Sequence, residues 1–75
     1  MSSKKGKSVE EMQIELKMLR ARVIKKTTGA NIHRARNLLG AASMIIEQYD
    51  RTEDKEWLDL YEKAIASIID FLKEG

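Results

Sequence analysis

Residues 25–36, KKTTGANIHRAR, decide the fold because they contain the break between two helical segments. Thr27 and Thr28 are weak helix formers, and Gly29 is a helix breaker. The apolar positions also change phase here. A continuous helix would carry the apolar face of the second segment roughly 110° away from that of the first. The stretch therefore predicts two helices separated by a short break.

The segment before the break predicts a helix over about residues 9–26. Ser8 and Glu11, in SVEE, have the spacing of a capping box at its start. Apolar residues then follow two stripes on roughly opposite sides of the helix, of which a small bundle can easily bury only one. The first stripe is Val9, Met12, Leu16, Leu19 and Val23, and the second is Ile14, Met18 and Ala21.

The segment after the break predicts two more helices, over about residues 30–49 and 53–73. DRTED, residues 50–54, interrupts the apolar pattern between them, and Thr52 is the expected N-cap of the third helix. Each helix has one broad apolar face, which favours an antiparallel hairpin. With the first helix packed on this hairpin, the sequence predicts an all-α three-helix bundle.

A chain of 75 residues predicts one small domain, here residues 8–75. Residues 1–7 contain three lysines and a glycine, and we expect a disordered basic arm. The chain has no cysteine and no apolar run of about 20 residues, so we expect a soluble, cytoplasmic protein without a membrane span.

The charge is divided unevenly along the chain. Residues 1–38 carry ten Lys and Arg against three acids, a net charge of +7, whereas residues 39–75 carry four against nine, a net charge of −5. No acidic residue occurs between Glu15 and Glu47. This asymmetry indicates either a half that faces a polyanion or two halves that attract each other within or between subunits.

The cations on both sides of the break predict a phosphate site. A helix that begins after Gly29 directs backbone N–H groups and its positive dipole end toward this corner. Arginines near a helix N-terminus are unfavourable unless an anion offsets them. The candidate ligands are Lys25, Lys26, Thr27, Thr28, His33, Arg34 and Arg36. Two alternatives remain open: a helix-turn-helix that reads duplex DNA, and cations that are solvated or paired with acids of the third helix.

Catalytic and metal sites are not predicted. His33 is the single histidine, so neither a triad nor a histidine-rich metal site has a second histidine or thiol to use. The acids of residues 53–62 lie on one helix and lack a second cluster opposite them. We expect a non-enzymatic protein with no metal and no cofactor.

Two functions fit these patterns. The first is a small oligomeric regulator that binds nucleic acid, a nucleotide or another phosphate-bearing ligand through the basic corner. The second is a protein-interaction module, such as an adaptor or inhibitor, that uses the extra apolar stripes. In the second function these stripes engage a different protein. The apolar stripes otherwise predict a homo-oligomer. The predicted interface residues are Ile14, Met18, Ala21, Gly40 and Met44.

Overall fold

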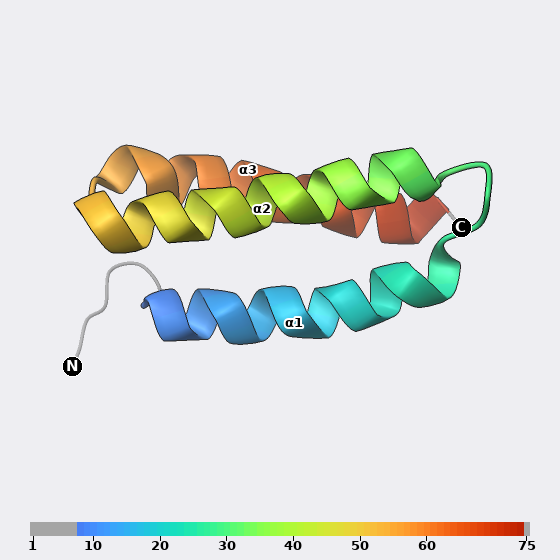
Figure 1. Ribbon diagram of the computed structural model, residues 1–75, viewed down its shortest axis with the longest axis horizontal. Coiled ribbons are helices and arrows are strands. Elements are labelled where there is room, and N and C mark those ends of the chain that lie inside the picture. The colour runs from blue at the N-terminus through green and yellow to red at the C-terminus, as the bar shows by residue number, and fades with distance from the viewer. Residues whose placement is uncertain (1–7, 75) are drawn as a thin grey trace.

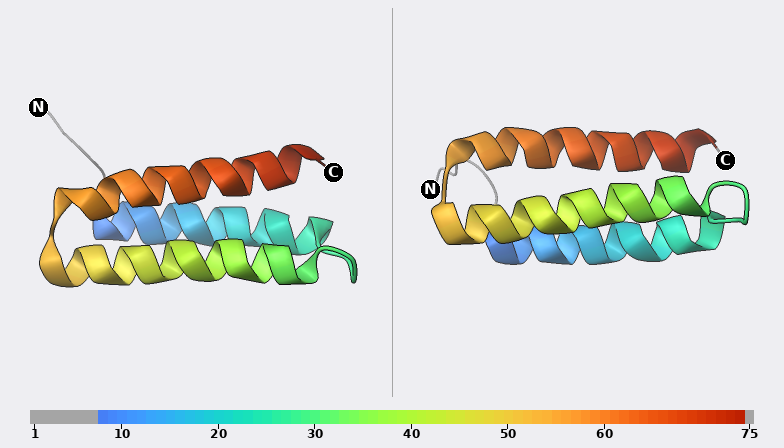
Figure 2. Two further views of the ribbon diagram at one scale, coloured as in Figure 1. Left: turned by 90° about the horizontal axis from the view of Figure 1, so that it is seen from above. Right: turned by 45° about the horizontal axis from the view of Figure 1, so that its top comes forward.

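The computed structural model describes residues 8–74 and contains three α-helices that pack against one another (Figure 1). The helices are α1 (Val9–Lys26), α2 (Ile32–Thr52) and α3 (Lys55–Glu74). No residue of the described range lies in a strand. Each helix runs antiparallel to the one before it, and all three are nearly aligned along the long axis (Figure 2). The prediction of an all-α three-helix bundle is confirmed. The predicted arm, residues 1–7, lies outside the described residues.

The start of α1 is fixed by the predicted capping box. The backbone N–H of Glu11 donates to Ser8 Oγ over 3.2 Å, and the N–H of Ser8 donates to Glu11 Oε1 over 3.1 Å. These bonds satisfy two donors that lack partners within the helix. The helix ends where Thr27 becomes extended, with φ −74° and ψ 133°.

The loop between α1 and α2 is longer than predicted. The second helix begins at Ile32 instead of residue 30, because the preceding residues form a hydrogen-bonded turn. Within this turn, Asn31 Oδ1 accepts from the Thr28 N–H at 2.7 Å, and Thr28 Oγ1 accepts from the Ala30 N–H at 3.2 Å. These local bonds compete with the helix, as is common for Asn and Thr side chains.

The connection between α2 and α3 also differs from the prediction. Thr52 is the last residue of α2 and does not cap α3. Glu53 ends the helix in the left-handed conformation, with φ 56° and ψ 27°. Asp54 takes over the capping role, because its Oδ1 accepts from the Glu56 N–H at 3.1 Å. The third helix therefore begins at residue 55.

The core runs along the axis where the three helices meet. The first apolar stripe of α1 faces this core as predicted, and no polar or charged residue of the described range is buried there. On α3, Phe71 is buried, whereas Ile69 is 40% exposed. Ile32 is also exposed, since it is the first residue of its helix. The buried residues are Met12, Leu19, Val23, Ala35, Ala42, Ile45, Ile46, Tyr61, Ile65, Ile68 and Phe71.

Candidate anion-binding groove

Two of the predicted phosphate ligands contact the C-terminal end of α3. Lys26 Nζ donates to the Leu72 carbonyl oxygen over 2.8 Å. Arg34 makes a two-pronged ion pair with the Glu74 carboxylate, at 2.7 and 2.9 Å. Its guanidinium also lies 5.6 Å from the centre of the Phe71 ring. The end of α3 lies beside the α1–α2 loop (Figure 2), so these cations offset its negative dipole end and its terminal acid.

The two predicted threonines contribute to the loop itself. Thr27 Oγ1 donates to the Val23 carbonyl oxygen over 2.7 Å, and the Thr28 hydroxyl accepts from the backbone as described above. Lys25 and His33 are exposed. Among the predicted ligands, Lys26 and Arg34 contact the end of α3. Arg36 lies elsewhere, in a groove between α1 and α2.

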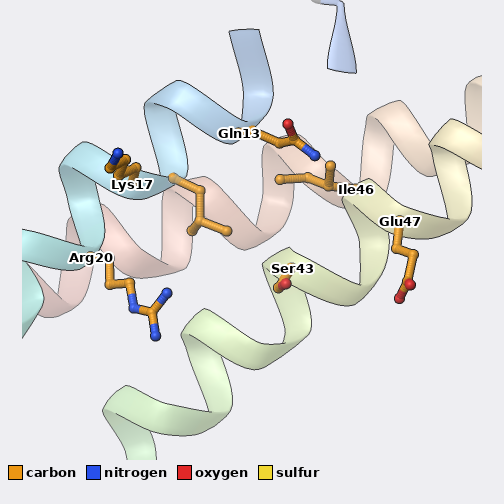
Figure 3. Close-up of a pocket in the computed structure, with 7 residues that line it drawn as sticks. Gln13, Lys17, Arg20, Ser43, Ile46 and Glu47 are labelled. Atoms are coloured by element: carbon orange, nitrogen blue, oxygen red, sulfur yellow. The ribbon is translucent and has the colours of Figure 1, made fainter. Parts of the chain in front are cut away.

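This α1–α2 groove consists of two adjoining hollows, of about 460 and 320 Å³. Figure 3 shows residues that line the larger one. Leu16, Arg20 and Ser43 line both hollows, so the groove is continuous. In Figure 3, Arg20 extends from α1 toward α2, and Ser43 lies on the α2 side of the same hollow. The remaining residues of the larger hollow are Gln13, Lys17, Ile46 and Glu47, and those of the smaller one are Arg36, Leu39 and Gly40.

The groove is predominantly cationic. Lys17 and Arg20 reach it from α1 and Arg36 from α2, while Glu47 is its single acid among the described lining residues. Within residues 8–74, none of the three cations has a hydrogen-bond or ion-pair partner, unlike Lys26 and Arg34. Unpaired like charges that share one groove repel one another, and an anion bound between them would remove this repulsion.

Sequence reasoning placed only Arg36 of these cations in a site. Lys17 and Arg20 belong to the same acid-free interval, which is the signal that points to them. The missing step was the antiparallel alignment of the two helices, which brings residues before and after the loop to opposite walls of one groove. This alignment also differs from a helix-turn-helix motif, whose helices cross at about 90–120°.

The predicted interface residues lie on two helices, and one of them belongs to the groove. Ile14 and Met18 are 55% and 64% exposed, and Ala21 is exposed on the same side of α1. On α2, Met44 is 54% exposed, whereas Gly40 lines the groove. Sequence reasoning missed Ile24 of α1, which is 61% exposed.

Searches of protein-family models, curated proteins and solved structures found no match to this chain. None of the described helices is both long enough and apolar enough to cross a membrane. Residues 8–74 contain no group of three His, Cys, Asp or Glu side chains placed to hold a metal ion.

Proposed function

We propose that this protein is a small, non-enzymatic binding protein that holds a phosphate-bearing ligand, such as a nucleic-acid backbone or a nucleotide, in the α1–α2 groove. One observation carries the proposal. Arg20 and Arg36 approach the same groove from two helices, and neither has a carboxylate partner within residues 8–74. Guanidinium groups suit phosphate because their planar donors match its oxygens. The lack of cysteine fits a reducing cytoplasm as the proposed location.

The other groove residues support a ligand with phosphate at one end. Ser43 and Gln13 supply neutral hydrogen-bonding groups, and Leu16 and Leu39 add apolar surface. Aromatic side chains, on which single-stranded bases stack, do not occur among the described lining residues. The groove therefore favours a duplex backbone or a compact nucleotide over an unpaired strand.

The test compares Arg20→Glu and Arg36→Glu with wild type. Duplex DNA, duplex RNA and a nucleotide are titrated at low and moderate salt, with circular dichroism as the check of folding. Each reversal should weaken binding about tenfold or more, and higher salt should weaken wild-type binding as well. Lys63→Glu is the matched control, because Lys63 is exposed on α3 and does not line the groove.

Two outcomes contradict this function. Wild type that binds none of these probes at low salt excludes phosphate binding. A Lys63→Glu variant that loses as much affinity as Arg20→Glu would show that net charge, and not the groove, determines binding.

A protein-interaction module is the second candidate, favoured by the exposure of Ile14, Met18 and Ile24 on α1. An adaptor or inhibitor would cover these side chains with a different protein. Salt distinguishes the two functions, since an apolar interface responds weakly to ionic strength and a phosphate contact responds steeply.

A further inference from the structure

A strip of five exposed residues runs along the side of α1 that faces away from the core. Its members, spaced alternately three and four positions apart, are Glu11, Ile14, Met18, Ala21 and Lys25. This spacing keeps them on one side of a helix over a length of about 21 Å. The centre of the strip is apolar, with Ile14 55% and Met18 64% exposed. One end of the strip is acidic and the other basic.

We propose that this α1 strip pairs with the same strip of a second copy of the chain, antiparallel and around a two-fold axis at Met18. Glu11 and Lys25 lie seven positions on either side of Met18. An antiparallel pair therefore brings Glu11 of each copy opposite Lys25 of the other, and the two-fold axis makes this contact twice. A parallel pair would bring like charges together. The charge pattern therefore favours a second copy of the chain as the partner, and an antiparallel orientation of its α1 helix.

The capping box leaves this contact possible. The bond from Ser8 uses Oε1 of Glu11, and Oε2 has no partner within residues 8–74. Lys25 is exposed and likewise has no partner in that range. Both charges at the ends of the α1 strip can therefore face a second copy without breaking a bond of the described fold.

Other surfaces of the chain fit the strip less well. The exposed apolar residues of α3, Leu60 and Ile69, are nine positions apart and hence lie on opposite sides of that helix. Met44 of α2 is followed by Glu47 and Arg51 on its side of the helix, but Asn37, seven positions before it, is uncharged, so this side of α2 matches at most one charged end of the strip. A second α1 strip is the partner that matches both the apolar centre and the charged ends.

The first test reverses the charges and then exchanges them. Lys25→Glu places two acids opposite each other at both ends of the interface, so the dissociation constant of the dimer should rise about 2- to 30-fold. Glu11→Lys combined with Lys25→Glu removes the capping bond from Ser8 but inverts the strip and restores its complementarity. Dimerisation should recover in this variant, with circular dichroism as the check that its helix content matches that of Lys25→Glu. Lys63→Glu changes charge equally on α3 and should leave the constant unchanged. Sedimentation equilibrium at low salt, without ligand, measures all four proteins.

The second test uses the absence of cysteine from the chain. Met18→Cys lies on the two-fold axis and should form a disulfide-linked dimer on mild oxidation. Ile14→Cys should not, because its two copies are about 12 Å apart along the helices, beyond disulfide reach. A parallel pair would link both variants, so this result overturns the antiparallel arrangement. Met44→Cys is the control for random collision.

The proposal is overturned if the protein has a monomeric mass at all concentrations up to millimolar. In that case the α1 strip would contact a different protein or face solvent. It is also overturned if the double exchange dimerises no better than Lys25→Glu, or if Met44→Cys links as fast as Met18→Cys. Because the measurements contain no nucleic acid or nucleotide, they are independent of the groove function.

Discussion

The hydroxyl of Tyr61 connects α3 to α1 and gives a sharp test of the packing. The Tyr61 side chain is 1% exposed. Its hydroxyl donates to Glu15 Oε1 over 2.6 Å and also lies 3.4 Å from the Met12 carbonyl oxygen. Tyr61→Phe removes the hydroxyl and leaves the ring in place. The substitution therefore isolates the hydrogen bond from the apolar core.

The expected loss of stability follows from the hydrogen bond between Tyr61 and Glu15. A hydrogen bond to a charged group contributes about 1.5–3 kcal/mol. Glu15 is only half-buried, so its carboxylate regains water in the variant. We therefore expect Tyr61→Phe to lower the free energy of unfolding by about 1–2 kcal/mol. For a domain of this size, this corresponds to a decrease in Tm of about 4–16 °C.

Urea unfolding, followed by circular dichroism at 222 nm, measures the loss. A double-mutant cycle with Glu15→Ala, which removes the acceptor, assigns it, because the two substitutions should be less than additive if the side chains interact. A Tyr61→Phe variant within about 0.3 kcal/mol of wild type, or a cycle with no coupling, would refute the reasoning. In that case the hydroxyl would be no more than a tolerated polar group.

The same contact predicts sensitivity to alkaline pH. Burial, together with the hydrogen bond to Glu15, raises the pKa of Tyr61 above its ordinary value of 10.0. Above pH 10 the unfolded chain loses this phenolic proton while the folded chain retains it, so stability should fall as pH rises through this range. The fall should be smaller in Tyr61→Phe.

Two further predictions concern α2 and its contacts. Gly40→Ala should raise the free energy of unfolding by about 0.5–1 kcal/mol, measured in urea, because a Cβ at this helical position has open space around it; a loss would show that the backbone here needs glycine. The hydrogen bond from Arg34 lowers the pKa of Glu74 below its ordinary value of 4.5, so the stability from this pair is present above that pH and lost below it. The dependence of Tm on pH should consequently be flatter in Glu74→Gln, and an unchanged profile would exclude the pair as a stabilising contact.

The helices were predictable because their signals are local. The capping box of Ser8 and Glu11 and the phase change at Gly29 act within one or two turns of the chain. The N-cap of α3 was not predictable, since Thr52 and Asp54 can both cap a helix and the left-handed conformation of Glu53 selects Asp54. Local capping propensity does not show which of two such neighbours becomes the cap.

The candidate site was harder to predict because it depends on how helix ends align in space. The sequence left open whether Lys26 and Arg34 hold an anion, face solvent or pair with the third helix. In the structure the end of α3 returns to them after more than 35 residues and supplies a carbonyl and a carboxylate. Arg36 was predicted as a ligand beside the loop and Arg20 was not placed in any site, yet two helices bring both to one groove. Charge asymmetry indicated the cationic half of the chain, and the packing distinguished the paired cations of that half from the unpaired ones.

The proposed groove function and the proposed dimer also bear on each other. An antiparallel pair of α1 helices is related by an axis perpendicular to the plane that contains both, so a groove on one flank of α1 opens on the same face of the dimer in each copy. A long duplex could then contact both grooves at once, whereas a mononucleotide contacts only one. Lys25→Glu should therefore weaken duplex binding at protein concentrations near the dimer dissociation constant and leave mononucleotide binding unchanged. If both ligands lose affinity equally, Lys25 contacts phosphate directly, and the grooves act one at a time.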